Sequence, residues 1–232
     1  MAKSILKKIL KLGGVSISRH QKEFETYEAL FKKYSNFTMV PPVQFVFNLD
    51  LVRNFETLAG DYVECGVWRG GMTAAIAESA SHRRRFHLFD SFEGLPPAKE
   101  IDGQEALAWQ RNVSSPGYFN NCTAEENFCI QAMQMAGHDN YRIYKGWFNE
   151  TLAQYEKRPI AILRLDGDWY DSIKVCLEEL FPLVVPGGIV ILDDYFTWDG
   201  CTRAVHDYLS QNQNPSRIHQ WKNNVGYLVK KG

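Results

Sequence analysis

Four aspartates follow two largely apolar stretches of the sequence, and their spacing suggests chemistry with a cation. Residues 160–165 and 187–192 are typical of buried strands. The acids that follow them are Asp166, Asp168, Asp193 and Asp194. If the two strands are neighbours in a parallel sheet, these side chains meet at the edge where such sheets bind ligands. A cluster of like charges is costly without a cation between them, so the pattern predicts a metal site.

A glycine turn between a strand and a helix is the second candidate site. The predicted strand at residues 62–66 leads into a turn with Gly66 and Gly70, and residues 72–81 follow as a helix. Such a turn lets the backbone approach a ligand and directs free N–H groups of the helix start toward it. The next predicted strand ends at Asp90, which is placed to accept hydrogen bonds from both hydroxyls of a ribose. We therefore expect an adenosine-bearing ligand, although Asp90 could instead cap a turn.

Strands and helices alternate around both sites, which predicts an α/β fold with a parallel sheet and helices on both faces. Residues 91–121 show few regular signals and contain several aromatic side chains, so we expect a mobile lid there. The further expected elements are a helix from a capping box at Thr123 and Glu126 to residue 136, a strand at 141–145, a short helix after Asn149, helices at 172–180 and 201–209, and strands at 217–221 and 226–229. The last two strands are close in sequence and should pair antiparallel.

The first 59 residues are predicted to form a helical segment ahead of the α/β domain at residues 60–232. Apolar side chains recur with helical period in residues 21–34 and 45–58. This segment could close a substrate pocket or mediate contacts between subunits. We expect the protein to form a homo-oligomer. Residues 3–12 alternate lysines with aliphatic side chains, a pattern of a helix on an anionic membrane surface or of one packed on its own domain or a partner copy.

Composition narrows the class of protein. The chain has 232 residues and a formal net charge of -1, so it lacks the basic surface of a nucleic-acid-binding protein. Its five cysteines form no CxxC pair, which favours reduced thiols and a cytoplasmic location. No apolar run approaches the ~20 residues of a membrane-spanning helix.

Five motifs occur in a fixed order between about residues 60 and 210. They are YVECGVWRGG at 62–71, FDSFEGLP at 89–96, KGWFNETL at 145–152, LDGDWYDS at 165–172 and PGGIVILDDY at 186–195. Together they resemble the macrocin O-methyltransferase family. The resemblance implies an enzyme that depends on S-adenosylmethionine and Mg²⁺, with the Rossmann-like class I methyltransferase fold, a seven-stranded sheet whose last strand is antiparallel.

The resemblance also implies roles for individual residues. The expected cofactor-binding residues are Glu64, Gly66, Val67, Gly70, Thr73, Asp90, Ser91 and Asp166. Within this set, Glu64 and Gly66 are expected by the methionine half, Thr73 near its carboxylate and Asp90 at the ribose. The expected metal ligands are Asp166, Asp193 and Asp194, and Asp168 matches the proposed general base. His206 is the rival base, because it lies on the predicted helix after the acid pair, although a histidine among apolar neighbours is commonly structural.

The expected reaction is transfer of a methyl group to a hydroxyl of a small natural product, in particular of a sugar that it carries. A phenol, catechol, polyketide or peptide hydroxyl is the alternative acceptor. Trp169 stands where related catechol enzymes have a basic lysine, which argues against a plain catechol enzyme. A nucleotide-dependent oxidoreductase would also use a glycine turn and a ribose acid, but the G-x-x-x-G spacing and the acids oppose it. A non-enzymatic adenosine-ligand binder is a third possibility.

Overall fold

The predicted strands assemble into one mostly parallel sheet. A computed structural model describes residues 22–80, 84–222 and 225–232. Within them, seven strands pair in the order β3-β2-β1-β4-β5-β7-β6. The strands are β1 (Asp61–Cys65), β2 (Phe86–Asp90), β3 (Tyr141–Lys145), β4 (Ile160–Leu165), β5 (Val184–Leu192), β6 (Ile218–Trp221) and β7 (Val225–Val229). β7 pairs antiparallel with β5 and β6, which confirms the predicted topology.

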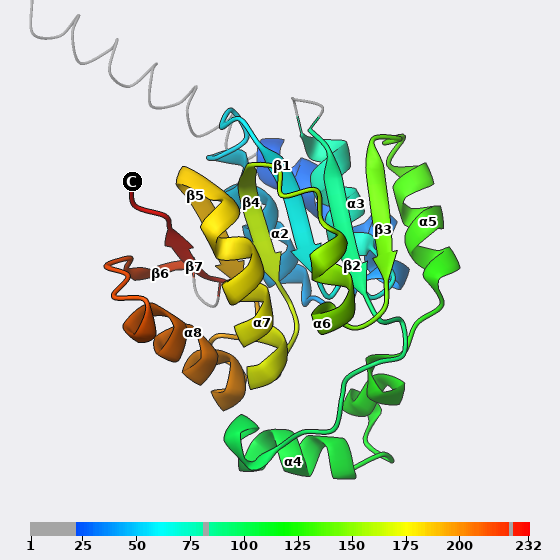
Figure 1. The fold of residues 1–232 in the computed structure, drawn as a ribbon. Helices are drawn as coiled ribbons and strands as arrows, with labels where there is room; N and C mark the ends of the chain where they lie inside the picture. The colour runs from blue at the N-terminus through cyan, green and yellow to red at the C-terminus, as the bar shows by residue number, and fades with distance from the viewer. Residues whose placement is uncertain (1–21, 81–83, 223–224) are drawn as a thin grey trace, which may run out of the picture.

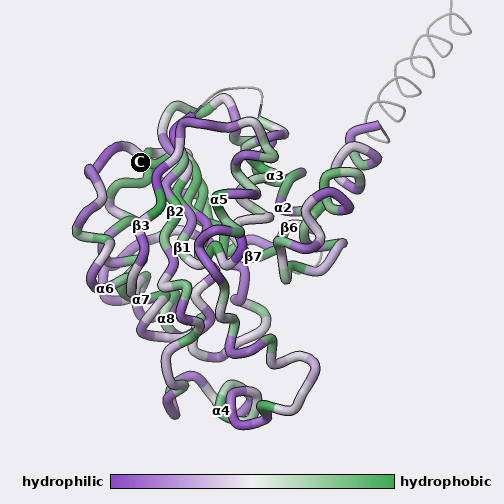
Figure 2. Tube along the Cα trace, turned by 90° about the vertical axis from the view of Figure 1, so that its right-hand side faces the viewer, coloured by the Kyte–Doolittle hydropathy of each residue, from purple (hydrophilic) through white to green (hydrophobic). Residues whose placement is uncertain are grey.

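Helices cover both faces of the sheet (Figure 1). One face carries α2 (Pro42–Arg53), α3 (Gly71–Ser79) and α5 (Glu126–Met135), and the other carries α6 (Phe148–Thr151), α7 (Tyr170–Leu180) and α8 (Asp199–Gln211). Every residue of β1 and β4 is consequently buried. Because helices cover both faces, the central strands appear in the sequence as continuous apolar runs rather than as alternating apolar and polar residues. Green, hydrophobic stretches of the chain run through the middle of the sheet in Figure 2.

The helices that precede β1 pack against the β6–β7 hairpin. Residues 22–34 are helical, and this helix stands beside β6 at the edge of the molecule (Figure 2). The Nζ of Lys222 lies 2.6 Å from Asp50 Oδ2 of α2 and 4.5 Å from the ring centroid of Phe24. Trp221 Nε1 also donates to Asp50, at 3.0 Å. The predicted helix at 45–58 is shifted, because Pro42 starts α2 and the helix ends at Arg53. The predicted helix at residues 3–12 lies outside the described residues.

The segment at 91–121 contains more regular structure than its sequence indicates. It holds helix α4 (Gln104–Arg111), which stands beyond the carboxyl ends of the strands (Figure 1). It is also anchored: Asp102, 3% exposed, accepts the backbone N–H of Tyr170 at the start of α7, at 2.7 Å. Residues 119–122 all have positive φ and end the segment in a left-handed turn.

The capping box predicted at Thr123 is wrong. α5 begins at Glu126 with Glu125 as the N-cap, and no side chain caps it. The Thr123 hydroxyl instead donates to the carbonyl of Glu93 at 3.3 Å. A tertiary contact with the segment at 91–121, the expected lid, has therefore replaced the local contact, which the residue spacing alone could not show.

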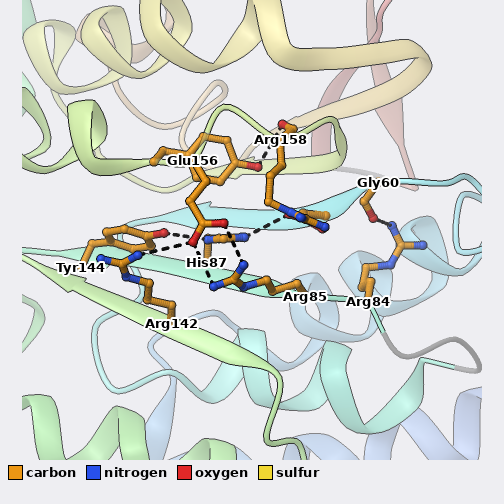
Figure 3. A network of polar contacts seen from close by, with 10 residues as sticks. Gly60, Arg84, Arg85, His87, Arg142, Tyr144, Glu156 and Arg158 are labelled. Atoms are coloured by element: carbon orange, nitrogen blue, oxygen red, sulfur yellow. Dashed lines mark hydrogen bonds and ion pairs between the residues drawn. The ribbon is translucent and has the colours of Figure 1, made fainter.

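A polar network lies near the amino-terminal ends of the strands, away from the acids (Figure 3). Buried His87 of β2 contacts Tyr144 Oη at 2.9 Å and Asp61 Oδ2 at 3.1 Å. Arg158 Nε donates to the same Asp61 oxygen at 2.7 Å. The network joins β1, β2, β3 and the segment before β4, and all its buried polar atoms have partners, as a stabilising network requires.

Two further sequence expectations concern cysteines and membranes. All five cysteines are free thiols, and four of them are buried. Among the residues that the structure describes, no helix has the length and apolar character needed to cross a bilayer.

Candidate active site

A cavity of about 930 Å³ lies at the carboxyl ends of the central strands. The glycine turn after β1 and the acids after β4 and β5 line the same cavity, as the parallel sheet predicts. The lid contributes Trp109 and Phe119 to the wall, and the segment before β1 contributes Thr38–Pro41. The Arg69 guanidinium donates to the Asn36 carbonyl at 3.2 Å and so ties this segment to the glycine turn.

The glycine turn depends on Gly66. Its φ is +90°, and a Cβ placed there would lie 1.7 Å from the carbonyl oxygen of Asp166. Val67 also lines the cavity. Gly70 stands at the start of α3, has a φ of +78° and packs against Cys129. It shapes the turn but does not line the cavity. Only glycine permits the close approach of β1 to β4 at this point.

Glu64 is held in place by side chains from three elements. It lines the cavity but is only 1% exposed. The Tyr62 hydroxyl donates to Oε2 at 2.6 Å, the Thr73 hydroxyl of α3 donates to the same oxygen, and Arg164 Nη1 donates to Oε1 at 2.7 Å. Thr73 is fully buried and reaches Glu64 rather than the cavity. Thr73 therefore lies behind the carboxylate of Glu64 and supports it, rather than lining the cavity itself.

Asp90 ends β2 with its carboxylate already oriented. Oδ2 accepts the backbone N–H of Trp68, and Oδ1 accepts that of Phe92, both at 2.7 Å. Burial raises the pKa of Asp90 to about 6, against the effect of these hydrogen bonds. Ser91 also lines the cavity, where its hydroxyl accepts the N–H of Glu93 at 3.0 Å and stabilises the turn.

Three of the four predicted acids converge. One oxygen from each of Asp166, Asp168 and Asp194 lies within 4.8 Å of the other two. Asp193 lines the same cavity, but its Oδ1 accepts a hydrogen bond from Arg164 Nη2 at 2.5 Å. The structure thus groups Asp168 with Asp166 and Asp194 and leaves Asp193 outside the group, and Arg164 pairs with both Asp193 and Asp166.

Burial and neighbouring carboxylates raise the pKa values of the converging acids. Burial and the neighbouring Asp193 carboxylate raise the pKa of Asp166, and burial and the Asp168 carboxylate raise that of Asp194. Burial raises the pKa of Asp168 to about 7, although a hydrogen bond from Trp198 lowers it. A proton or a hard cation would relieve the repulsion, and three carboxylates are a donor set that suits Mg²⁺.

The backbone directs Asp168 into the cluster. Its φ of +54° is left-handed, a conformation that aspartate tolerates better than most residues. Its N–H donates to Asp194 Oδ2 at 3.1 Å, and its Oδ1 accepts Trp198 Nε1 at 2.9 Å. Trp198 packs edge-on against Trp169 and lid residue Trp109, with ring centroids 5.3 and 6.1 Å away. The lid therefore contacts the residue that orients Asp168.

His206, the rival base, lies elsewhere. It is exposed on α8, outside the cavity lining, and its Nε2 lies 3.0 Å from the hydroxyl of Tyr195.

Comparison with known proteins places this site in a family. A family model described as "Macrocin-O-methyltransferase (TylF)" matches residues 48–229, well over half of the chain. The chain belongs to the TylF macrocin O-methyltransferase family. The matched TylF region contains the glycine turn, Asp90, the lid and all four acids, whereas the cavity residues Thr38–Pro41 precede it.

Several TylF relatives methylate natural products, as their names state. The chain is 39% identical over 160 residues to an "8-demethyl-8-(2,3-dimethoxy-alpha-L-rhamnosyl)-tetracenomycin-C 4'-O-methyltransferase" from Streptomyces olivaceus, covering 66% of this chain and 59% of that protein. It is 33% identical over 160 residues to a "Mycinamicin III 3''-O-methyltransferase" from Micromonospora griseorubida, covering 66% and 61%. The match thus spans about three fifths of each relative's length.

The solved structure of "the O-methyltransferase NovP" superposes on the chain with a TM-score of 0.68 at 26% identity. The match covers 84% of this chain and 83% of that chain. This similarity extends over the sheet and its helices and supports the class I methyltransferase fold for this TylF member.

Sequence reasoning missed Arg164 and Trp198 as parts of the site. Arg164 could have been identified from the sequence, because it is the one charged residue within the apolar run at 160–165. Trp198 carried none, since it reaches Asp168 only through the turn between β5 and α8.

Proposed function

We propose that this protein is a divalent-cation-dependent O-methyltransferase that transfers the methyl group of S-adenosylmethionine to a sugar hydroxyl of a glycosylated natural product. One observation supports this proposal above the others. A single cavity combines a glycine turn, a ribose-type acid and three converging carboxylates in a chain of the TylF family. A donor and an acceptor could therefore lie side by side in one enclosed space.

On the donor side, Asp90 would accept the ribose hydroxyls and Glu64 would face the methionine half. Asp90 is suited to this role because backbone N–H groups already fix both of its oxygens. Gly66 and Val67 would let the donor lie directly on the end of β1. Such preorganisation reduces the entropy that donor binding costs.

On the acceptor side, Asp166, Asp168 and Asp194 would hold the cation, with Asp193 next to them. When bound, a divalent cation supplies Lewis-acid activation that lowers the pKa of an acceptor hydroxyl. The carboxylates fit this group, because their oxygens converge and their pKa values are raised in its absence. The family resemblance implies Asp193 as the third ligand, whereas in this set Asp168 takes its place.

Asp168 would also accept the hydroxyl proton as the acceptor oxygen bonds to the methyl carbon and the carbon–sulfur bond breaks. The Asp168 carboxylate lies in the cavity wall beside the other two acids, within reach of a hydroxyl held at the cation. Trp198 would hold the carboxylate in one orientation during this transfer.

A sugar fits the remaining wall of the cavity. Trp109 and Trp198 lie beside the acids and offer apolar ring faces to a sugar, while their indole N–H groups donate to Gly117 and Asp168. The names of the relatives refer to methylation of a rhamnosyl group and of mycinamicin III. The lid would exclude water once the acceptor is bound.

The decisive experiment compares donors and removes the cation. Calorimetry should show binding of S-adenosylmethionine but not of NAD, and glycosylated natural products should gain a methyl mass in its presence. A chelator should abolish methyl transfer and Mg²⁺ should restore it. Binding of NAD alone would favour an oxidoreductase, and S-adenosylmethionine binding with no transfer to any screened acceptor would favour a non-enzymatic binder.

A further inference from the structure

The central strand β4 carries a fully buried arginine between the two halves of the cavity. Arg164 is 0% exposed and lies beside Glu64 of β1 on one side and Ile191 of β5 on the other. Burying a guanidinium costs several kcal/mol unless charged partners and hydrogen bonds compensate. Its contacts should therefore explain why β4 retains a charge at this position.

Arg164 contacts carboxylates on three neighbouring strand ends. Nη1 donates to Glu64 Oε1 at 2.7 Å and to Asp166 Oδ2 at 2.8 Å. Nη2 donates to Asp193 Oδ1 at 2.5 Å. All three carboxylates line the cavity, so one side chain touches both the expected donor-binding acid and the acids at the cation site.

The shape of the guanidinium makes this arrangement specific. Its N–H groups diverge in a rigid plane, so one arginine can hold three carboxylates at fixed angles. A lysine ammonium is a compact charge on a flexible stem and cannot reproduce that geometry. Within the described residues the Arg164 Nε has no hydrogen-bond partner, so it is the outer nitrogens that hold the acids.

We propose that Arg164 is a positioning residue that fixes Glu64 on the donor side and Asp166 and Asp193 on the cation side. This inference rests on the proposed function, because it assigns the two halves of the cavity to donor and cation. Donor binding and cation binding then both depend on one buried side chain, although Arg164 itself contacts neither ligand.

The test measures binding rather than turnover. Calorimetry with S-adenosylhomocysteine and, separately, with Mn²⁺ is carried out on the wild-type protein, Arg164→Lys and Arg164→Met. Because displaced supporting residues commonly cost 10–100-fold in ligand affinity, we expect both affinities to fall by at least about tenfold in both variants. The retained charge of Arg164→Lys should not rescue binding.

Arg158→Met is the matched control. It removes another arginine that pairs with a buried carboxylate, Asp61, at the amino-terminal ends of the strands (Figure 3). It should lower the thermal midpoint and leave both affinities within about twofold of wild type. A loss of affinity that merely accompanies destabilisation would appear in this variant too, and that result would overturn the inference.

Asp193→Asn provides a second route if Arg164→Met does not fold. This change loosens Arg164 from the cation side only, so S-adenosylhomocysteine should bind about threefold or more weakly although Glu64 is intact. Unchanged affinities in Arg164→Lys and Asp193→Asn, with a wild type that binds both ligands, would overturn this inference alone. A wild type that binds no S-adenosylhomocysteine would overturn the proposed function and this inference with it.

Discussion

At the scale of single residues, Asp168 is oriented by its left-handed backbone and by the hydrogen bond from Trp198. Asp168→Asn should lower kcat by about 10²–10⁴-fold, because the amide keeps the size of the side chain but cannot accept the acceptor's proton. S-adenosylhomocysteine affinity should stay within about threefold of wild type, since the donor residues are untouched. Methyl-transfer kinetics together with calorimetry check both statements.

His206→Gln is the control for that assignment. His206 is exposed and lies outside the cavity lining, so kcat should change by less than about twofold. If His206→Gln abolished turnover and Asp168→Asn did not, the base would have to be reassigned.

Asp90 gives donor binding a dependence on pH. Its pKa of about 6 in the folded protein lies above the ordinary value, so the carboxylate is ionised above pH 6 and protonated below it. A protonated Asp90 loses acceptor capacity for the ribose hydroxyls. The Kd for S-adenosylhomocysteine should be constant above about pH 7 and should rise toward about tenfold per pH unit well below 6. Calorimetry from pH 5 to 8 measures this.

Asp90→Asn supplies the comparison. Its affinity should be low and nearly constant over the same range, because no titrating group remains at the ribose. A wild-type affinity that is flat from pH 5 to 8 would contradict the role given to Asp90.

The sequence predicts the positions of these acids but not all their partners. Strand ends in a parallel sheet define where Asp90, Asp166 and Asp194 lie. Asp193 pairs with Arg164 rather than joining the expected cation site, and this hydrogen bond connects the end of β5 with β4. Such cross-strand choices follow from side-chain packing in three dimensions and have no local signature.

At the scale of elements, the glycine turn after β1 should tolerate no side chain. Gly66→Ala introduces a Cβ that overlaps the Asp166 carbonyl and disfavours a φ of +90°. We expect a loss of more than about 2 kcal/mol in the free energy of unfolding and no measurable donor binding. Urea denaturation and calorimetry test this.

Gly137→Ala separates the clash from the backbone effect. Gly137 also has positive φ, +64°, but a Cβ there would meet nothing within 4 Å. Its cost should be about 1 kcal/mol with donor affinity unchanged. Equal effects at both positions would show that close approach to β4 is unimportant.

The lid should depend on its anchor at Asp102. Asp102→Ala removes the acceptor of the Tyr170 N–H, so the segment that leads into α4 should detach from the start of α7 more often. We expect faster cleavage of the lid in limited proteolysis and a KM for the acceptor raised about three- to tenfold. Lys99→Ala, which removes an exposed ion pair to Asp171 in the same region, should leave the rate of cleavage close to wild type.

Elements were less predictable where tertiary contacts outweigh local signals. The strands of the core followed from their apolar runs, but α4 did not, because its first residues follow Gly103 without a side-chain cap. The left-handed turn at 119–122 includes two asparagines, which favour that conformation, yet Phe119 gives no such indication.

At the scale of the whole molecule, the network around His87 should make the stability of the fold fall as the pH becomes acidic. Burial raises the pKa of Asp61, but hydrogen bonds from His87 and Arg158 outweigh it, so the pKa lies below its ordinary value. A lowered pKa means that Asp61 stabilises the fold above about pH 4 and that this contribution is lost as the pH falls further. Asp61→Asn should cost about 1–3 kcal/mol at pH 7.

Unfolding by urea at several pH values tests this linkage. The difference in stability between wild type and Asp61→Asn should shrink as the pH falls below 4. A constant difference would show that the Asp61 charge does not contribute. This network could not be predicted from the sequence, because its members belong to β1, β2, β3 and the segment before β4.

The contact between Asp50 and Lys222 also sets an order of events during protein synthesis. The two residues are 172 positions apart. A ribosome adding ~5–20 residues per second makes Lys222 roughly 9–34 s after Asp50. Throughout that interval α2 is present without the β6–β7 hairpin that packs against it. The face of α2 that carries Asp50 can therefore be buried only late in biosynthesis and stays accessible to chaperones until then.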